Sequence, residues 1–450
     1  MLRSRWGELK GVFPMTAIAK ECSFFRNTFL NIISSETANP ANFTSQSAFT
    51  RKRQIDLHEL VLLPFQLTEE SLAASFPWIL FKGGSSVSAS AVSQARSKIN
   101  SSLYKNVFNR FNKATSGSDV KTFKGYRLLA VDGSEIQVLP EQDNDITYGA
   151  SKKGKKRHFV HLNAEFDVLN SVFTDALLQP GSEKNEDSAL LELARRSSFQ
   201  KAIFIADRGY EALMSFYRLQ KEHIPFVIRI KDETSSTSIL KYYETPESEE
   251  YDIPFNVTLT SKNNRHIKDH WDVYKYTSSY SKHPEFDDQT TELPLNIRAV
   301  RFKAVCEGNE SFITVCTNLS ETEFGTEDIK QIYRLRWQVE VGFRGLKRNT
   351  DLEWTHSRKR DLVRSEIYAK MTLYNLCSRL RNKVEKSRQH QKRIAQAKKH
   401  KQKADFGFII KTIQQWLFKK ARISLSTLED LLLARISPIR EGRADTRKKK

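Results

Sequence analysis

The chain has 450 residues, of which 73 are Lys or Arg and 53 are Asp or Glu, so its formal net charge is +20. This surplus suits a polyanionic partner such as DNA or RNA, although ribosome-associated and membrane-surface proteins share such compositions. No window approaches 18 uninterrupted apolar residues, and the N-terminus lacks the apolar stretch of a secretion signal, so we expect a bacterial cytoplasmic protein. Four cysteines without a C-x-x-C pair indicate reduced thiols. Cys306 and Cys316 flank a predicted hairpin, and we favour packed free thiols over a contact across it.

Residues 1–118 are predicted to be helical, because apolar residues recur at helical spacing and strand alternation is lacking. Ser85, Ser86 or Ser88 is a candidate cap for a polar helix that includes Arg96. This polar helix is compatible with a recognition helix in a DNA groove and equally with a solvated helix.

From about residue 124 the pattern changes to strand, strand, strand, helix, strand, helix, strand, which predicts an α/β sheet with helices on its faces. Residues 231–324 are rich in Thr, Ser, Tyr and Val in alternating runs, which predicts a separate β-rich insertion. Long helices are expected at 327–349 and 361–386. The following residues are strongly basic and contain one more amphipathic helix.

The predicted helix at 327–349 carries four functional candidates on one face. At 100° per residue from Tyr333, Arg336 falls at about −60°, Glu340 at about −20° and Lys347 at about −40°. In this arrangement the acid, Glu340, could bind a metal, and the hydroxyl of Tyr333 and the two cations could bind a neighbouring phosphate. The alternative is an amphipathic helix with ordinary surface ion pairs.

Two aspartates share a second pattern. Asp132 and Asp207 each follow a short apolar strand and are followed within two residues by a glycine. The carboxyl ends of strands form the edge at which α/β sites lie, so the two carboxylates converge if their strands are neighbours. The alternative is that each is only a turn residue, since Asp-Gly is a common turn signal.

Together, Asp132, Asp207 and Glu340 supply three hard oxygen donors and leave coordination positions open, as Mg²⁺ prefers. Two such ions about 3.5–4 Å apart can support an in-line phosphoryl transfer. Each of these features alone is common. Their combination, two matched strand-end aspartates and one helix acid flanked by cations, is much less expected by chance.

These motifs resemble the insertion-sequence-four family of D-D-E transposases. The resemblance lies in Asp132-Gly133-Ser134, in Asp207-Arg208-Gly209-Tyr210, and in the Y-x2-R-x3-E-x6-K spacing from Tyr333 to Lys347. It covers residues 124–375 well and the N-terminal part only loosely, chiefly at 88–99.

The resemblance implies a fold of the α/β class. It implies an RNase H-like core of mixed sheet and flanking helices (119–230 and 325–375) and a β-strand insertion (231–324). A helical DNA-binding domain (1–118) would precede the core, and a basic helical region (376–450) would follow it. It also implies two Mg²⁺ ions, for which Mn²⁺ is expected to substitute, bound by Asp132, Asp207 and Glu340. Tyr333, Arg336, Lys347 and, with less support, Arg208 would hold a DNA phosphate.

The implied activity is cleavage at the terminal inverted repeats of a mobile element and joining of 3′ ends to target DNA, in some relatives through a hairpin. A nucleoid-associated homodimer on paired ends is expected. The rival hypotheses are a structure-specific nuclease on the same fold and a decayed transposase that only binds DNA. The intact acids argue against decay.

Other candidates are weaker. Trp271, Tyr274 and Tyr276 form an aromatic run that suits a flipped base but is better explained as strand packing. His158 and His161 differ by an odd offset on a strand, so they face opposite sides and are not expected to share a metal. The basic run 152–158 contacts DNA or is a solvated turn.

Overall fold

The computed structural model describes residues 16–438 except 52–53, 69, 76–80, 83–84, 118, 141–147, 151–155, 278–282, 307–308, 354, 396–401 and 419–421. Most of the basic run at 152–158 and all of the C-terminal TRKKK sequence therefore lie outside the described residues. Within them, no helix combines the length and the apolar character needed to cross a bilayer.

The N-terminal part of the chain is helical, as predicted, apart from one two-stranded ribbon. Its helices are α1 (Ala17–Thr37), α2 (Leu57–Leu62), α3 (Leu72–Ser75), α5 (Ala89–Arg96) and α6 (Ser101–Ala114), with 3₁₀ turns η1 (Pro40–Asn42) and η2 (Leu63–Phe65). The ribbon pairs β1 (Phe81–Lys82) with β2 (Ser85–Ser86). Of the three predicted caps for α5, Ser88 takes the role, because its hydroxyl accepts a hydrogen bond from the backbone N–H of Ala91.

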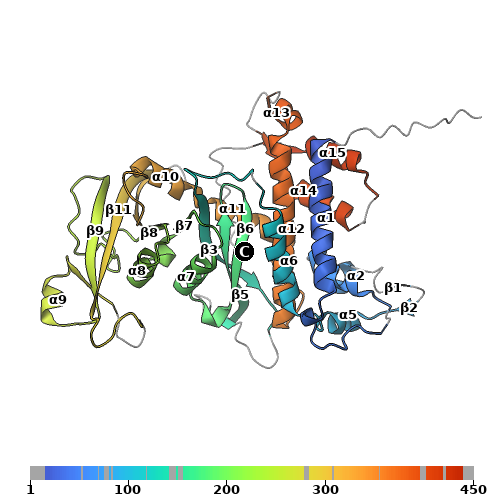
Figure 1. The fold of residues 1–450 in the computed structure, drawn as a ribbon, viewed down its shortest axis with the longest axis horizontal. Coiled ribbons are helices and arrows are strands. Elements are labelled where there is room, and N and C mark those ends of the chain that lie inside the picture. The colour runs from blue at the N-terminus through green and yellow to red at the C-terminus, as the bar shows by residue number, and fades with distance from the viewer. Residues whose placement is uncertain are drawn as a thin grey trace, which may run out of the picture.

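A ten-stranded mixed sheet forms the centre of the molecule (Figure 1). Its strands are β3 (Arg127–Gln137), β4 (Tyr148–Ala150), β5 (Lys156–Asp167), β6 (Val172–Pro180), β7 (Ala202–Ala206), β8 (Phe226–Arg229), β9 (Tyr251–Thr260), β10 (Tyr274–Tyr276), β11 (Glu292–Cys306) and β12 (Asn309–Thr317). The order is β10-β9-β11-β12-β8-β7-β3-β5-β4, with β6 also paired to β5. The strands of the predicted insertion thus continue the core sheet, since β12 pairs with β8.

The central strands are buried on both faces. Leu128 and Ala130 of β3 belong to the hydrophobic cluster shared with helix α12, whereas Leu129 and Val131 belong to the cluster shared with helices α7 and α8. Strand β7 is buried at all five positions. Such fully apolar strands are expected where helices cover both faces of a sheet.

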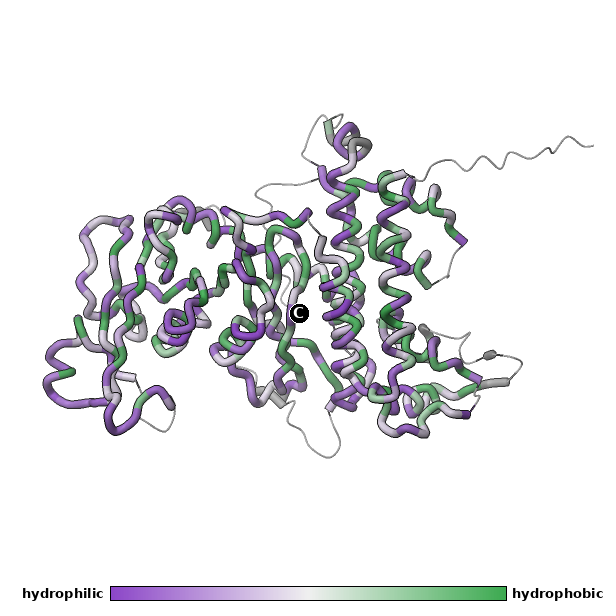
Figure 2. Tube along the Cα trace, viewed as in Figure 1, coloured by the Kyte–Doolittle hydropathy of each residue, from purple (hydrophilic) through white to green (hydrophobic). Residues whose placement is uncertain are grey.

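The helices that cover the sheet are α7 (Glu186–Arg196), α8 (Leu213–Lys221), α10 (Thr326–Leu335), α11 (Gln338–Asn349) and α12 (Arg360–Lys386). Helix α12 packs beside α6 and α1, and β9 and β11 lie at the opposite end of the molecule (Figure 1). Figure 2 shows hydrophobic residues along the central strands and a hydrophilic segment around α9 (Arg265–Asp269).

The C-terminal part completes the helical end of the molecule. It contains α13 (Arg388–Ala395), α14 (Phe406–Leu417) and α15 (Leu425–Ala434), with a ribbon of β13 (Gln402–Ala404) and β14 (Ile436–Pro438). The remaining short elements are the 3₁₀ turns η3 (Gly181–Glu183) and η4 (Arg208–Tyr210).

Three sequence predictions were wrong in detail. Strand β3 does not end at Asp132 but runs on to Gln137, because β5 pairs with it throughout. The predicted helix 327–349 is two helices, since the backbone tightens at the break, where the N–H of Arg336 donates to Tyr333 O and the N–H of Val339 donates to Arg336 O, each three residues back. The disfavoured alternative of a contact between Cys306 and Cys316 is not supported either, because their partners in register across the β11–β12 hairpin are Asn309 and Ala299. Trp271 and Tyr276 are exposed rather than packed within the sheet.

Candidate active site

The register of β3 and β7 places the two predicted aspartates at the same level of the sheet. These parallel strands pair from Arg127↔Ala202 to Ala130↔Ile205, a constant offset of 75 residues. The same offset relates Asp132 to Asp207, two residues beyond the last pair (207 − 132 = 75). Asp207 directly follows β7 and caps η4.

Both carboxylates are held by the backbone of the glycine in their own motif. Asp132 Oδ1 accepts a hydrogen bond from Gly133 N at 2.8 Å, and Asp207 Oδ1 accepts one from Gly209 N at 2.8 Å. The glycine therefore restricts the orientation of each carboxylate.

Helix α11 brings the third acid to this edge. Its Gly342 lies so close to β5 that a Cβ atom there would be 2.7 Å from Cε2 of Phe166. Glu340 lies two residues earlier on the same helix, and its charge acts on Asp132, so it lies near this edge. Glu340 Oε1 accepts a hydrogen bond from Nη2 of Arg336 at 2.9 Å, so two members of the predicted set are in contact.

The acids influence one another electrostatically. The pKa of Asp132 is raised to about 7. Burial is the largest cause, and the nearby charges of Asp207 and Glu340 also act to raise it. Arg336 and the hydrogen bond from Gly133 act in the opposite direction. Crowded carboxylates of this kind are stabilised by a bound cation.

The donor chemistry of this edge fits a divalent metal. Carboxylate oxygens are the ligands that Mg²⁺ and Mn²⁺ prefer. Within the described residues, no group of three His, Cys, Asp or Glu side chains is arranged to hold a single ion, and Glu340 is held by Arg336. The fit therefore rests on the crowding of carboxylates around Asp132 and not on a preformed cage.

The predicted phosphate-binding residues differ in burial and in the groups that they contact. Tyr333 is only 6% exposed, its ring centroid is 5.9 Å from the Arg336 guanidinium carbon, and burial raises the pKa of its hydroxyl. Lys347 Nζ donates to the backbone oxygen of Glu135 on β3 at 2.7 Å, and burial lowers its pKa. Arg208 is exposed beside Asp207.

Sequence reasoning missed a second group of polar residues beside the aspartates. Glu186, the first residue of α7, has Oε1 3.4 Å from Nε2 of His161 and 2.8 Å from Nζ of Lys184. The close approach of the His161 ring is the main cause that lowers the pKa of Glu186 to about 2. The only sequence signal for Glu186 was its place as an acid at the start of a helix, and such acids are common. Nearby Tyr210 is buried, and its pKa is raised first by burial and then by these acids.

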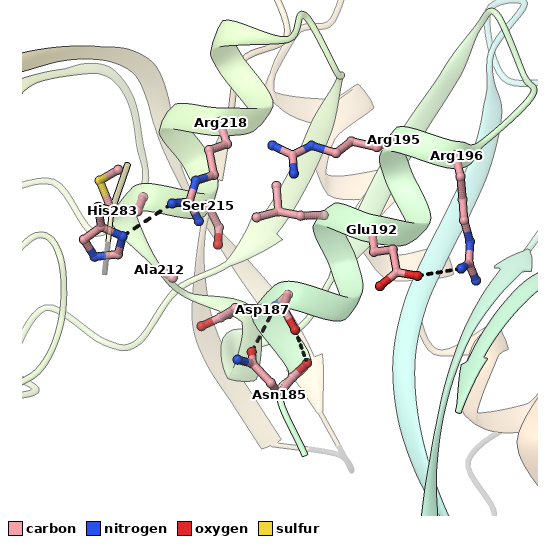
Figure 3. Close-up of a pocket in the computed structure, with 12 residues that line it drawn as sticks. Asn185, Asp187, Glu192, Arg195, Arg196, Ala212, Ser215, Arg218 and His283 are labelled. Carbon is pink, nitrogen blue, oxygen red and sulfur yellow. Dashed lines mark hydrogen bonds and ion pairs between the residues drawn. The ribbon is translucent and has the colours of Figure 1, made fainter. Parts of the chain in front are cut away.

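A pocket of about 680 Å³ lies on the α7–α8 side of the sheet (Figure 3). None of the three predicted acids lines it, and each of its three arginines is paired with a carboxylate: Arg195 with Glu222, Arg196 with Asp175 and Glu192, and Arg218 with Glu285. This pocket is therefore separate from the carboxylate site.

Predicted DNA contact by α5 is not supported at Arg96. This side chain is buried and paired with Glu366 of α12, so it faces the protein core.

Comparison with known proteins gives the following relationships. Residues 123–376 match a family model described as "Transposase DDE domain". "Transposase InsG for insertion sequence element IS4" of Escherichia coli (strain K12) is 22% identical over 302 residues, 64% of this chain and 60% of that protein. "Transposase for insertion sequence element IS421" of Escherichia coli is 32% identical over 59 residues, 13% of this chain and 16% of that protein. The chain thus matches less than two thirds of the length of these curated relatives.

Among solved structures, the chain resembles a "piggyBac transposase synaptic complex with hairpin DNA". The identity is 10%, the coverage is 96% of this chain and 78% of that chain, and the TM-score is 0.40. This likeness is too distant to establish the fold.

Proposed function

Because the chain belongs to the family of transposases with a DDE domain, we propose that it is the DNA transposase of an insertion sequence. It binds the terminal inverted repeats of the element, cleaves DNA strands there and joins the 3′ ends to target DNA. The observation that carries this proposal is the alignment of Asp132 and Asp207 on adjacent strands, with Glu340 close enough to raise the pKa of Asp132.

The family implies a divalent metal, and we propose two Mg²⁺ ions, replaceable by Mn²⁺, held by Asp132, Asp207 and Glu340. When bound, they would supply activation of the attacking oxygen and stabilisation of the leaving oxygen. Arg336 holds Glu340 in place at 2.9 Å and neutralises part of the charge of the acids.

The cations of this edge would bind the DNA backbone. Arg336 offers a planar fork for a phosphate, and Lys347 offers a point charge. Arg208 is exposed beside Asp207 and is free of the burial that restricts Tyr333. We therefore assign Arg208, Arg336 and Lys347 to phosphate contact, and Tyr333 to a contact that requires its buried hydroxyl to become accessible when DNA binds.

The topology supports an RNase H-like core. Strands β3, β5 and β6 are antiparallel neighbours, and β7 and β8 add in parallel on the other side of β3. We propose that residues 119–230 and 325–375 form this core, that 231–324 are the insertion, and that 1–118 and 376–450 are accessory regions. The positive net charge supports DNA as the partner, and the need to pair two ends supports a homodimer at the bacterial nucleoid.

An excision assay in bacterial cells tests this function. A reporter plasmid carries the element with its flanking DNA, and the native protein is compared with Asp132→Ala, Asp207→Ala and Glu340→Ala. We expect excision by the native protein and a loss of at least about 10³-fold in each variant, with end binding retained.

The other outcomes separate the rival hypotheses. Excision unaffected by the three substitutions would overturn the site. Cleavage without joining to target DNA would indicate a nuclease, and end binding without cleavage by the native protein would indicate a decayed transposase.

A further inference from the structure

A buried pair of side chains lies between the two aspartate motifs. His161 of β5 is 1% exposed, and its Nε2 is 3.4 Å from Oε1 of Glu186 at the start of α7. Within the described part of the chain, neither ring nitrogen of His161 has a hydrogen-bond partner of good geometry. Glu186 is thus the polar group that faces this ring, and Lys184 Nζ contacts the same carboxylate oxygen of Glu186 at 2.8 Å.

The pair contacts the backbone of both motif glycines. A Cβ atom at Gly133 would lie 2.4 Å from His161 Nε2 and 3.1 Å from Glu186 Oε1. A Cβ atom at Gly209 would lie 3.1 Å from Glu186 Oε2. The pair therefore fills the space between the two glycines, and at position 133 a side chain as small as alanine would collide with it.

These contacts reach the carboxylates through the backbone. Gly133 N–H donates to Asp132, and Gly209 N–H donates to Asp207, each at 2.8 Å. Since successive side chains of a strand alternate between faces, Gly133 faces the α7 side with Val131, whereas Asp132 faces the α11 side with Ala130. The pair is therefore placed to act on Asp132 from the opposite face of the sheet.

We propose that His161 and Glu186 are a positioning pair that sets the separation of Asp132 and Asp207 and thereby the affinity of this edge for divalent metal. The inference rests on the proposed function, because it assumes that both aspartates are metal ligands. Side chains behind metal ligands commonly change metal affinity about 10–100-fold when they are replaced.

Binding of Mn²⁺ to the full-length protein tests the pair, with electron paramagnetic resonance reporting free Mn²⁺ and thermal unfolding in chelator reporting stability. Glu186→Gln keeps the shape of the side chain but loses its charge, and we expect Mn²⁺ affinity to fall about 10-fold. The matched control is Glu192→Gln on the exposed side of the same helix, which should bind Mn²⁺ like the native protein.

A double-mutant cycle tests the contact with the glycine. Gly133→Ala should lower Mn²⁺ affinity about 10-fold, because the new methyl group displaces His161. In the His161→Ala background the same substitution should have little further effect, because the colliding ring is gone. A merely structural role would lower the unfolding temperature without such coupling in Mn²⁺ affinity.

Asp132→Ala separates failure of this inference from failure of the proposed function. If Asp132→Ala abolishes Mn²⁺ binding but Glu186→Gln and Gly133→Ala leave it unchanged, the positioning pair is overturned and the active site stands. If the native protein binds no Mn²⁺, or Asp132→Ala has no effect, both are overturned.

Discussion

At the scale of single residues, two exposed arginines, Arg208 and Arg195, differ in what surrounds them. Arg208 lies exposed in η4, directly after Asp207. Arg195 in α7 is also exposed, but Nε and Nη2 both donate to the carboxylate of Glu222, at 2.9 and 2.5 Å. A guanidinium that already holds a carboxylate has few donors left for a phosphate. The two residues therefore form a matched pair for testing DNA contact.

We predict that Arg208→Ala reduces the salt dependence of end binding by about one unit in the slope of log K against log salt concentration, as loss of one phosphate contact should. Arg195→Ala should leave the slope unchanged. Fluorescence anisotropy with labelled end DNA at several salt concentrations measures both slopes. Equal slopes for Arg208→Ala and the native protein would remove Arg208 from the phosphate-binding set.

At the scale of elements, the position of α11 depends on a glycine. Replacing Gly342 by alanine gains about 1 kcal/mol of helix propensity but puts a Cβ atom 2.7 Å from Phe166. Phe166 is 1% exposed and packs on Phe173, so it cannot move away easily. The collision should outweigh the propensity, because overpacking a core costs about 1–3 kcal/mol.

We predict that Gly342→Ala lowers the free energy of unfolding by about 1–2 kcal/mol and also lowers excision, since α11 carries Glu340. The control is Gly345→Ala on the same helix, which gains the same propensity while its Cβ atom meets Tyr374 at 3.1 Å, a less severe approach than 2.7 Å, so it should lose less stability. Urea unfolding and the excision assay measure the two effects. A stability gain in Gly342→Ala would show that α11 does not depend on this contact.

The same elements show which features the sequence could predict. The helix at 361–386 was predicted to within one residue of α12, because its periodic pattern is long and uninterrupted. The three acids were predicted as ligands because each stands at a recognisable position in a motif. The continuation of β3 past Asp132 was missed, because Asp-Gly is a turn signal and only the pairing with β5, a long-range contact, overrides it. The pairing of His161 with Glu186 was missed for the same reason, since these two residues meet only through the fold.

At the scale of the whole molecule, a buried ionic cluster joins the N-terminal helices to the core. Glu366 of α12 accepts from Arg96 of α5 at 3.0 Å and lies 3.1 Å from Nδ1 of His356. His356 Nε2 lies 3.0 Å from the backbone oxygen of Glu70 in the N-terminal part. Replacing Glu366 by glutamine should cost about 3–5 kcal/mol of stability, because it leaves Arg96 buried without its countercharge.

The cluster also predicts how stability changes with pH. Burial alone would lower the pKa of His356, but the hydrogen bond and charge of Glu366 outweigh burial and raise it above 6.5. Burial alone would raise the pKa of Glu366, but His356 and Arg96 outweigh burial and lower it below 4.5. The contribution of His356 is therefore fully present below pH 6.5 and lost as pH rises through its raised pKa. That of Glu366 is present above pH 4.5 and lost as pH falls through its lowered pKa.

We predict that the free energy of unfolding falls between pH 6 and pH 8 in the native protein and that His356→Gln removes part of this fall, because glutamine does not titrate. His266→Gln, at an exposed position in α9, is the control and should keep the native pH dependence. Urea unfolding at pH 6, 7 and 8 measures the effect. An unchanged pH dependence in His356→Gln would show that His356 carries no charge at pH 6, and the junction between the N-terminal helices and the core would then depend on Arg96 and Glu366 alone.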